Sequence, residues 1–357
     1  MTNSIDEYLK NRAEVVNKAI GNYLSNVKDP RFLAFLIARS GYSFDATAIE
    51  KAILEPANYL LSAGGKRWRP IIMLELIEAL GKDPNYYFEF SIIPEVIHNG
   101  TLIHDDIEDG STMRRGIEVV HKRYGIDIAL NLGDFMFYFP IIALLDSKKL
   151  STKIKMRALE VYQRDMLKIA IGQATDLAWH SGKVDLEQID ESKYLQMAYS
   201  KTGVLIGFSA ELAGILCGVD ARTLKSLGNF GSTIGVAFQI TDDILNLTPS
   251  KLSENKGGVG DDISEGKVTL MLIHVMKEGN EKDKQRIKQI ISMHTSDIAL
   301  VNEAISIMRK YGAMEYASKK AEDLIKSSWK EIDEILPKSQ AKERLKKIVN
   351  MLSSRKV

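Results

Sequence analysis

Two aspartate clusters stand at the ends of apolar segments, where their carboxylates could hold a metal ion. Asp105 and Asp109 follow the apolar segment 92–103. Asp242 closes a second apolar segment, 230–240. Because Asp105 and Asp109 are four positions apart, they share one helix face, where their charges repel unless a cation joins them. Carboxylate oxygens suit Mg²⁺, which is often shared with substrate phosphates. Either cluster alone is more often a solvated helix end, but the two together indicate one cavity filled by metal ions.

Cations accompany these carboxylates along the same part of the chain. They are Lys66, Arg67 and Arg69 in the segment 64–70, Arg114 and Arg115 after the first aspartates, and Lys201, Lys256 and Lys267 further on. Arginine offers forked hydrogen-bond donors and lysine a compact charge, so cations beside metal-bound carboxylates suit a diphosphate. Taken singly, each cation is more often a solvated surface residue. That interpretation is weakest for Lys201, because its neighbours are apolar.

The elements that must position these residues are predicted to be helices. Apolar residues recur at spacings of three and four, and strand-like alternation is hard to find, so the chain is expected to be all-α. The windows are 49–61, 71–80, 154–178, 195–216, 224–247 and 299–335, the last with a break at Gly312. Gly64 and Gly65 are expected to end one helix, and Pro70 suits the first turn of the next. The polar, glycine-rich segment 249–266 is expected to be a mobile loop.

No linker, low-complexity tract or internal repeat divides the 357 residues, and their hydrophobic content of 45% can bury a large core. We therefore expect one all-α domain, 1–357, built as a helical bundle. A central cavity is expected between the two aspartate-rich helices. The residues that could do chemistry fall within 64–267, and 268–357 adds C-terminal helices.

The composition excludes some classes of protein. Lys plus Arg is 48 and Asp plus Glu is 47, so the formal net charge of +1 does not indicate a nucleic-acid-binding protein. The single cysteine, Cys217, cannot form an intrachain disulfide and is expected to be a buried residue in a reducing compartment. The N-terminal residues do not resemble a signal peptide, and the longest apolar stretch, 135–145, is too short to span a bilayer. It is expected to be one buried helix, which favours a cytoplasmic protein without membrane spans.

The motifs resemble those of the trans-isoprenyl diphosphate synthases, the polyprenyl synthetase family. The segment 98–109 is similar to the family's first aspartate-rich motif, and Arg-Arg-Gly follows at 114–116. The segments 64–70, 172–177, 201–202, 238–243 and 262–267 are similar to its other motifs. They occur in the family's order, and their text is most similar to geranylgeranyl diphosphate synthases of the eukaryotic type. The resemblance also implies the isoprenoid-synthase type of helical bundle.

The resemblance implies a role for each residue that matches a motif. Asp105, Asp109 and Asp242 would hold Mg²⁺ ions, and Asp106, Asp243 and Gln239 would orient ligands and waters around them. Arg114, Lys201 and Lys267 would bind an allylic diphosphate, and Lys66, Arg69, His98 and Arg115 would bind isopentenyl diphosphate. Thr202 and Gln239 would turn oxygen atoms toward a developing carbocation.

Four residues need separate treatment. Asn246 stands where many relatives have Asp, so it is not assigned to the metal. Lys256 matches the family's loop lysine at a slightly wider spacing and is expected near the substrate. His104 is interpreted as structural, because a lone histidine near an apolar helix usually is. His98 is treated as a ligand contact only because of its place in the motif.

The family implies Mg²⁺-dependent, head-to-tail condensation of isopentenyl diphosphate with dimethylallyl, geranyl or farnesyl diphosphate, by a homodimer. Product length is expected to follow the depth of an apolar tunnel below the first aspartates. Gly100 and Thr101 are small and leave the tunnel open there, whereas Phe137 and Tyr138 match floor positions. Ala170 could let longer chains pass. Together these features favour a C20 product, geranylgeranyl diphosphate, over farnesyl or longer polyprenyl products.

Two other classes of protein remain as alternatives. A class I terpene cyclase also has an aspartate-rich helix, but its second metal motif needs Ser or Thr and then Glu at spacings of four. From Asp242 those positions hold Asn246 and Ser250, so the pattern fails. A non-catalytic regulatory subunit of a synthase should have lost acidic or basic site residues, and this chain keeps nearly all of them.

Overall fold

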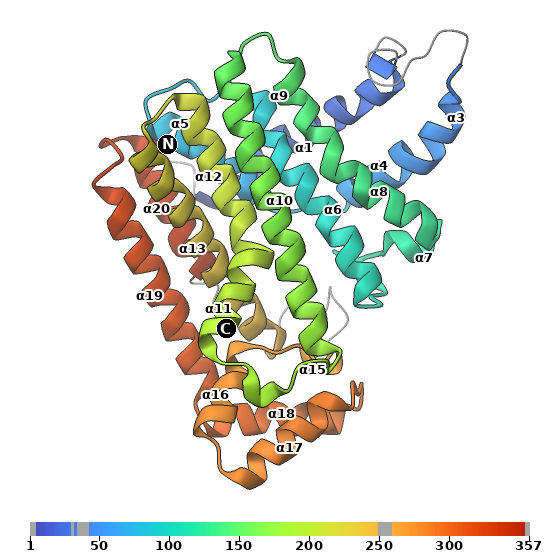
Figure 1. Cartoon of the computed structure of the whole chain (residues 1–357), viewed down its shortest axis with the longest axis vertical. Coiled ribbons are helices and arrows are strands. Elements are labelled where there is room, and N and C mark those ends of the chain that lie inside the picture. The colour runs from blue at the N-terminus through green and yellow to red at the C-terminus, as the bar shows by residue number, and fades with distance from the viewer. Residues whose placement is uncertain (1–4, 30–31, 34–42, 249–258, 354–357) are drawn as a thin grey trace. The chain divides into compact units, whose positions relative to one another are not determined.

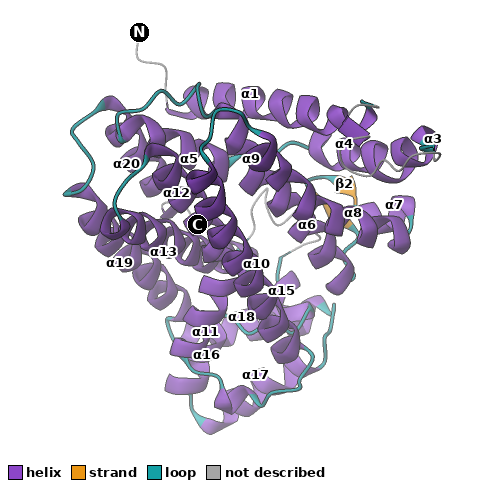
Figure 2. Cartoon of the chain, turned by 45° about the horizontal axis from the view of Figure 1, so that its top comes forward, coloured by secondary structure: helices purple, strands orange, loops and turns teal. Residues whose placement is uncertain are grey.

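The computed structural model describes residues 5–29, 32–33, 43–248 and 259–353, and helices form almost all of their regular structure (Figures 1 and 2). The strands within these ranges are β1, Met113–Arg114, and β2, Ile117–Glu118. They pair as an antiparallel hairpin in which Met113 lies opposite Glu118. The all-α fold class predicted from the sequence is therefore confirmed.

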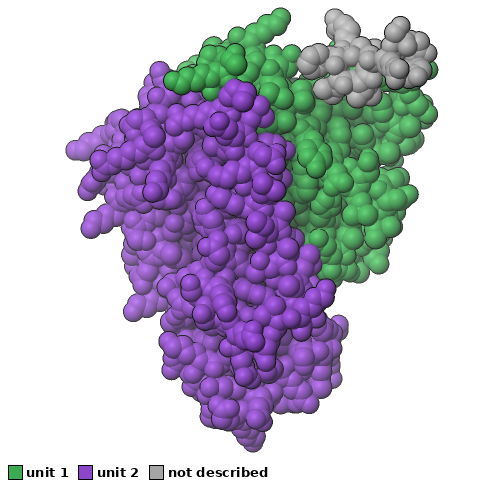
Figure 3. Space-filling view, viewed as in Figure 1, with its two compact units in different colours: residues 1–74, 83–155 green, residues 75–82, 156–357 purple. Residues whose placement is uncertain are grey.

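The chain divides into two compact units, which Figure 3 shows in different colours. Unit 1 comprises Met1–Leu74 and Asp83–Lys155, and unit 2 comprises Glu75–Lys82 and Met156–Val357. The first aspartate cluster falls in unit 1, and the second falls in unit 2. The organisation of all 357 residues as a single domain stays a prediction.

Unit 1 consists of helices, short helical turns and the β1–β2 hairpin. Its elements are α1 (Ile5–Ser25), η1 (Asn26–Lys28), α3 (Ala46–Ile49), η2 (Glu50–Leu54), α4 (Glu55–Ser62), the start of α5 (Trp68–Ala79), η3 (Phe88–Ser91), α6 (Ile92–Glu108), α7 (Val120–Tyr124), α8 (Ile126–Tyr138), η4 (Phe139–Ile141), α9 (Ile142–Asp146) and the start of α10 (Thr152–His180). The helix α6 lies at its centre and packs against α1, α7 and α8.

The helices α6 and α8 approach closely because glycines stand at their contact. A Cβ atom at Gly100 of α6 would lie 3.0 Å from the Gly133 carbonyl oxygen and 3.1 Å from a ring carbon of Phe137 on α8. A Cβ atom at Gly133 would collide with the ring of His104. The last turns of α6, which carry the first aspartates, are thereby held against α8.

Unit 2 contains the longer helices of the C-terminal half. Its elements are the rest of α5 and α10, then η5 (Leu186–Gln188), α11 (Glu191–Ala198), η6 (Tyr199–Gly203), α12 (Val204–Cys217), α13 (Ala221–Asn246), α15 (Asp261–Ser264), α16 (Leu270–Glu278), α17 (Glu281–Ser292), α18 (Ile298–Lys310), α19 (Ala313–Asp333) and α20 (Gln340–Ser353). The helix α13 is central and packs against α12, α19 and α20.

Glycines also bring α13 close to η6 and α12. A Cβ atom at Gly235 would lie 2.5 Å from the Cα atom of Gly203, and one at Gly231 would lie 2.6 Å from the Ile206 carbonyl oxygen. Real Cβ atoms do not approach other atoms so closely, so these positions require glycine. The backbone contact fixes η6 against the part of α13 that leads to the second aspartate cluster.

The helical windows predicted from the sequence coincide with helices in the structure. The windows 49–61, 71–80, 154–178, 195–216, 224–247 and 299–335 correspond to α3 to α4, α5, α10, α11 to α12, α13, and α18 to α19. The last pair separates at Gly312, which has a φ of 64°. Some features were not predicted. The turns η2 and η6 are π-helical and are inserted into otherwise regular windows, and the short helix α15 and the β1–β2 hairpin lie where no regular element was expected.

The apolar stretch 135–145 is not the single buried helix that the sequence predicted. It is shared among α8, η4 and α9, because Pro140 cannot continue the regular hydrogen-bond ladder. Tyr138 within it is 69% exposed. By length and composition alone, Ile126–Asp146 and Glu191–Cys217 could each cross a membrane, and most of the second is buried, as in the core helix of a soluble protein.

Candidate active site

The first acidic cluster occupies the last turn of α6 and its C-terminal cap. Asp105 and Asp106 lie in the last turn, and the Asp109 N–H at the cap donates to the Asp105 carbonyl oxygen at 2.8 Å. Asp105 and Asp109 are half-buried, whereas Asp106 is buried. The two carboxylates that are four positions apart are therefore the ones that solvent reaches.

Asp106 is paired with Arg114 of the hairpin. The Arg114 Nε donates to Asp106 Oδ1 at 2.8 Å, and Arg114 Nη2 contacts the same oxygen and lies 3.8 Å from the Asp105 carboxylate. Burial raises the pKa of the Asp106 carboxyl, and the Arg114 charge offsets part of that rise. Burial disfavours the Arg114 cation, but the charge and hydrogen bond of Asp106, together with the charges of Asp105 and Asp109, outweigh burial and raise the pKa of Arg114. Asp106 thus holds a charged guanidinium beside Asp105.

A cluster of cations surrounds His98 in unit 1. Burial lowers the pKa of His98 well below its usual range, and the charges of Arg69, Arg115, Arg67 and Arg114 lower it further. His98 is therefore neutral at physiological pH and can both donate and accept a hydrogen bond. Burial, followed by the charge of Arg67, lowers the pKa of Arg115 to about 10. Such a cluster is a strong attractor for anions.

Arg67 is the cation of this cluster for which the sequence suggested no role. Its side chain is fully buried, and its backbone φ is 52°. Arg67 Nη1 pairs with Glu95 Oε1 at 2.7 Å, Nε donates to Asn17 Oδ1 at 2.5 Å, and Nη2 donates to the Leu61 carbonyl oxygen at 3.2 Å. Arg67 thereby ties α1 and α4 to α6. Glu95, an acid inside the apolar segment 92–103, was the signal that could have revealed this pair.

The turn at Gly64 and Gly65 brings Arg115 against the same buried pair. Arg115 Nη1 donates to the Gly64 carbonyl oxygen at 2.5 Å and to Asn99 Oδ1 at 3.3 Å. Gly65 has a φ of 143°, and a Cβ atom there would lie 3.0 Å from Arg67 Nη1 and 3.2 Å from Arg115 Cζ. Glycine is therefore needed between the two guanidinium groups.

The two neighbours of Arg67 in the basic motif lie in different surroundings. Lys66 is exposed, with its Nζ 5.8 Å from the centre of the Trp68 ring. Arg69 is buried in the first turn of α5. The segment 66–69 therefore contains an exposed cation, Lys66, and two buried cations, Arg67 and Arg69.

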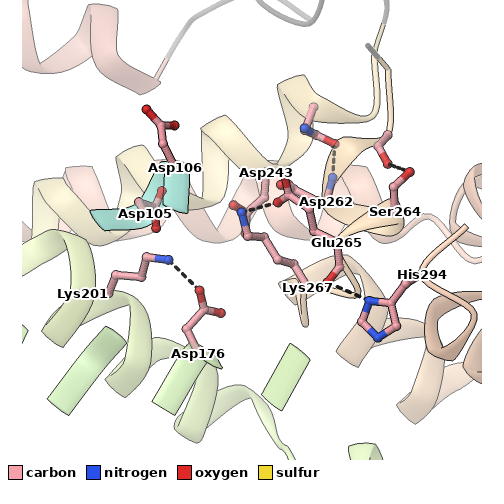
Figure 4. A network of polar contacts seen from close by, with 12 residues as sticks. Asp105, Asp106, Asp176, Lys201, Asp243, Asp262, Ser264, Glu265, Lys267 and His294 are labelled. Carbon is pink, nitrogen blue, oxygen red and sulfur yellow. Dashed lines mark hydrogen bonds and ion pairs between the residues drawn. The ribbon is translucent and has the colours of Figure 1, made fainter. Parts of the chain in front are cut away.

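In unit 2, Lys201 and Thr202 lie in η6, the π-helical turn between α11 and α12. Such turns are frequent at functional sites. The helix α10 approaches η6 at Gly172, where a Cβ atom would lie 2.8 Å from the Cα atom of Lys201. Lys201 Nζ accordingly pairs with Asp176 Oδ2 of α10 at 2.6 Å (Figure 4).

Thr202 begins a chain of hydrogen bonds that reaches α13 and α11. Thr202 Oγ1 donates to Gln239 Oε1 at 2.6 Å, and Gln239 Nε2 donates to Asp243 Oδ1 at 2.7 Å. The Tyr194 hydroxyl donates to Asp243 Oδ2 at 2.7 Å. Burial, followed by the charge of Asp262, raises the pKa of Asp243 to about 8. Both carboxyl oxygens of Asp243 are thus held by protein groups.

Lys267 follows the short helix α15, which Asn246 joins to the end of α13. Asn246 Oδ1 accepts a hydrogen bond from the Asp262 N–H at 3.1 Å, and its carbonyl oxygen accepts one from the Gly260 N–H at 2.8 Å. The Lys267 N–H donates to the Asp262 carbonyl oxygen at 2.8 Å, and its Nζ pairs with the Glu265 carboxylate (Figure 4). Asn246 therefore holds the start of the segment that presents Lys267.

Three residues that were expected to control product length, Gly100 and Thr101 of α6 and Phe137 of α8, have local packing or hydrogen-bonding roles. Gly100 is buried against α8, so its small size is needed for the helix contact described above. Thr101 is half-buried, and its hydroxyl donates to the His98 carbonyl oxygen at 2.8 Å. Phe137 packs edge-on against His104, with 5.0 Å between the ring centres. His104 is thus a packing residue in this contact, as its sequence context suggested.

The other two chain-length candidates are exposed. Tyr138 is at the end of α8 and is 69% exposed, and Ala170 lies on the exposed side of α10. Neither side chain packs into the interior of its own unit. Of the residues predicted to form a tunnel floor, Phe137 is the one that the structure keeps in an apolar contact.

Within the ranges that the structure describes, no three His, Cys, Asp or Glu side chains form a ready-made metal site. The aspartates nevertheless fit Mg²⁺ by their chemistry. Asp105 and Asp109 present hard oxygen atoms at the solvent-accessible end of α6, and Asp242 is half-buried near the end of α13. Mg²⁺ is usually held by one or two carboxylates together with water and substrate phosphates. Lys256 lies outside the described residues.

Comparisons with known proteins agree with the family that the motifs resemble. Residues 50–308 match the family model described as polyprenyl synthetase. A short chain isoprenyl diphosphate synthase from Methanothermobacter thermautotrophicus is 35% identical over 305 residues, which are 85% of this chain and 91% of that protein. The crystal structure of a geranylgeranyl pyrophosphate synthetase from Pyrococcus horikoshii is similar with a TM-score of 0.83 and 33% identity, covering 99% of this chain and 98% of that one.

A third similar protein was solved with ligands. It is a polyprenyl synthase from Caulobacter crescentus, complexed with calcium and isoprenyl diphosphate, with a TM-score of 0.81 and 25% identity over 100% of this chain and 99% of that one. The fold therefore agrees with the comparisons over nearly the whole length. The chain belongs to the polyprenyl synthetase family and is a prenyltransferase that elongates prenyl diphosphates.

Proposed function

We propose that this prenyltransferase joins isopentenyl diphosphate head to tail to an allylic diphosphate and that its main product is C20, geranylgeranyl diphosphate. The observation that carries the proposal is the cationic cluster of unit 1. Its arginines are Arg67, Arg69, Arg114 and Arg115; Glu95 pairs with Arg67, and Asp106 and Asp105 lie within ion-pair distance of Arg114. The charges of these four arginines all act on the buried His98 and lower its pKa, so the same positive potential favours a diphosphate bound beside His98.

Each diphosphate has its own proposed set of cations. Lys66, Arg69, His98 and Arg115 are proposed to bind isopentenyl diphosphate, and Arg114, Lys201 and Lys267 the allylic diphosphate. The three allylic cations each have a carboxylate partner: Asp106, Asp176 and Glu265, respectively. These partners hold the cations in place before the substrate arrives and leave donors that can turn to phosphate oxygens.

Mg²⁺ is proposed to bind to Asp105, Asp109 and Asp242. Asp106 and Asp243 hydrogen-bond to protein groups, so their proposed role is to orient the residues around the metal rather than to ligate it. When bound, Mg²⁺ neutralises charge on the diphosphate and improves it as a leaving group. The half-buried carboxylates of Asp105, in the last turn of α6, and of Asp109, at its C-terminal cap, support this assignment.

The proposed reaction needs no covalent intermediate with the enzyme. The allylic C–O bond breaks, and both of its electrons leave with the diphosphate. The π electrons of isopentenyl diphosphate then form a bond to the allylic carbon, and a proton is lost to the released diphosphate. Thr202 donates its own proton to Gln239, so the lone pairs of its oxygen can face the developing positive charge.

The C20 product rests on Phe137 as the proposed floor of an apolar tunnel. Its ring is fixed between α6 and α8 by His104 and by the glycine contact at Gly100. The related proteins carry names from short chain to polyprenyl synthase, so the family alone leaves product length open. We further propose that the enzyme acts as a cytoplasmic homodimer without membrane spans.

A product assay tests this function. Purified protein, Mg²⁺, labelled isopentenyl diphosphate and farnesyl diphosphate should yield a labelled product that becomes a C20 alcohol on dephosphorylation, and a chelator should stop the reaction. Arg69→Gln should raise the KM for isopentenyl diphosphate. Arg123→Gln is the matched control, because Arg123 is an exposed arginine of the same unit that stacks on Tyr59. Failure to consume isopentenyl diphosphate would overturn the proposal. Products longer than C20 would be consistent with the proposed reaction but would show that Phe137 is not the floor of the tunnel.

A further inference from the structure

Three residues other than glycine have a positive φ within the described ranges. They are Arg67 at 52°, Arg115 at 54° and His294 at 47°. Side chains other than glycine adopt this conformation at a cost, and such strain concentrates where function needs it. Arg67 and Arg115 belong to the cationic cluster described above. His294 belongs to no family motif considered so far and lies in the turn between α17 and α18.

His294 packs against the segment that presents Lys267. Its Nδ1 lies 3.2 Å from the Glu265 carbonyl oxygen, which can only accept, so Nδ1 carries the proton and donates (Figure 4). The ring also covers Gly266, where a Cβ atom would lie 2.8 Å from Nδ1 and 3.2 Å from the carbonyl oxygen of His180 at the end of α10. The backbone at Gly266 is therefore enclosed between the His294 ring and α10.

This contact completes a set of anchors around Lys267. On its N-terminal side, the Lys267 N–H donates to the Asp262 carbonyl oxygen at 2.8 Å, and Asp262 is in turn held by Asn246. His294 lies outside the motif and adds a second contact, a hydrogen bond to the Glu265 carbonyl oxygen. The next residue, Gly266, has a φ of 76° and precedes Lys267. If the His294 ring is removed, the α17–α18 turn no longer donates a hydrogen bond to the Glu265 carbonyl oxygen.

We propose that His294 is a positioning residue for the allylic diphosphate: it holds the backbone from Glu265 to Lys267 so that the Lys267 ammonium is placed for the substrate. This inference rests on the proposed role of Lys267. It assigns part of the substrate site to a turn of the C-terminal helices, outside the segment 64–267 that carries every motif.

Two substitutions separate the hydrogen bond from the backbone conformation. His294→Gly keeps the positive φ and removes the ring and its donor. His294→Asn also tolerates a positive φ and places an amide nitrogen on the same carbon that bears Nδ1. Met293→Ala is the matched control, because the neighbouring Met293 side chain is 49% exposed in the same turn.

Steady-state kinetics should show a selective effect. His294→Gly should raise the KM for farnesyl diphosphate about three- to tenfold, the range expected for losing one hydrogen bond. The KM for isopentenyl diphosphate should stay within about twofold, and His294→Asn should recover most of the loss. Equal changes in both KM values, or no recovery with asparagine, would show that His294 has only a general structural role and would overturn the proposal.

Amide hydrogen exchange separates this inference from the proposed function. In protein without substrate or metal, His294→Gly should speed exchange at Gly266 and Lys267, and His294→Asn should restore the slower rate. Met293→Ala should leave these amides unchanged. If exchange is the same in all variants, the positioning role is wrong even when the enzyme is active. If exchange changes as expected but no prenyl transfer occurs, the positioning role stands and the proposed function is wrong.

Discussion

Replacing Glu95 with glutamine should destabilise the protein strongly, because it removes the charge that balances a buried arginine. The side chain of Arg67 is fully buried, that of Glu95 is 2% exposed, and 2.7 Å separates Nη1 from Oε1. Glutamine has nearly the same shape as glutamate, so no cavity forms and the loss is electrostatic. Removing one partner of a buried ion pair costs roughly 3–5 kcal/mol, because the other charge stays buried.

The other contacts of Arg67 place the expected loss near the lower end of that range. Asn17 Oδ1 and the Leu61 carbonyl oxygen still accept hydrogen bonds from the guanidinium in Glu95→Gln. We therefore expect the free energy of unfolding to fall by about 3 kcal/mol. For a unit of this size, a loss of that magnitude lowers the Tm by roughly 6–12 °C.

Calorimetry with a matched control measures this effect. Lys51 and Glu55 form an ion pair of similar length, 2.8 Å, on the surface of the same unit, with side chains 69% and 44% exposed. Glu55→Gln should change the Tm little, because solvent screens exposed pairs. A double variant, Arg67→Gln with Glu95→Gln, should lose less than the sum of the single losses. If Glu95→Gln lowers the Tm no more than Glu55→Gln, the buried pair does not stabilise unit 1 and the reasoning is refuted.

Four further predictions concern single residues. Asp105→Ala and Asp242→Ala should each abolish turnover with unchanged far-ultraviolet circular dichroism, and normal rates in either variant would contradict the metal assignment. Asp243→Asn, measured without divalent metal, should raise the Tm more at pH 8 than at pH 5. The pKa of Asp243 is about 8 in the folded state, so that state keeps a proton that the unfolded chain loses above about pH 4, and the parent loses stability as pH rises between these values. A Tm difference independent of pH would count against a raised pKa. Phe137→Ala should lengthen the product, and an unchanged product would place the floor elsewhere. Burial raises the pKa of Cys217 to about 12, so its thiol should react at pH 8 roughly a thousandfold more slowly than a free cysteine, and labelling at the free rate would exclude that burial.

The features that follow from local sequence were predictable. Helix positions follow from apolar spacing over ten or more residues, and the break at Gly312 follows from a single glycine. The clusters at Asp105 and Asp242 could be found because helical spacing alone places Asp105 and Asp109 on one face. Their metal binding was inferred from the residue types alone and stays a prediction.

The features that depend on distant partners were not predictable. In the sequence, Arg67 stands between Lys66 and Arg69 and resembles a surface cation. It is buried because its side chain pairs with Glu95 and Asn17, which are distant in the sequence. Tyr138 follows Phe137 directly, but successive residues of α8 point in different directions. The Phe137 ring therefore contacts His104, whereas the Tyr138 side chain is exposed to solvent. A pattern that describes one chain segment cannot distinguish such neighbours, since their surroundings come from other elements.

The π-helical turn η6 changes the helical phase of the run from α11 to α12. Each residue of an α-helix turns the chain by roughly 100°, and η6 inserts one extra residue into a turn. The faces of α12 are therefore rotated by about that angle from a regular continuation of α11. At the phase change, Lys201 reaches Asp176 on α10 while its neighbour Thr202 reaches Gln239 on α13. Deleting one residue from 199–203 would restore a uniform helical phase and move Lys201 or Thr202 away from its partner. The function of this turn therefore depends on its number of residues as well as on their types.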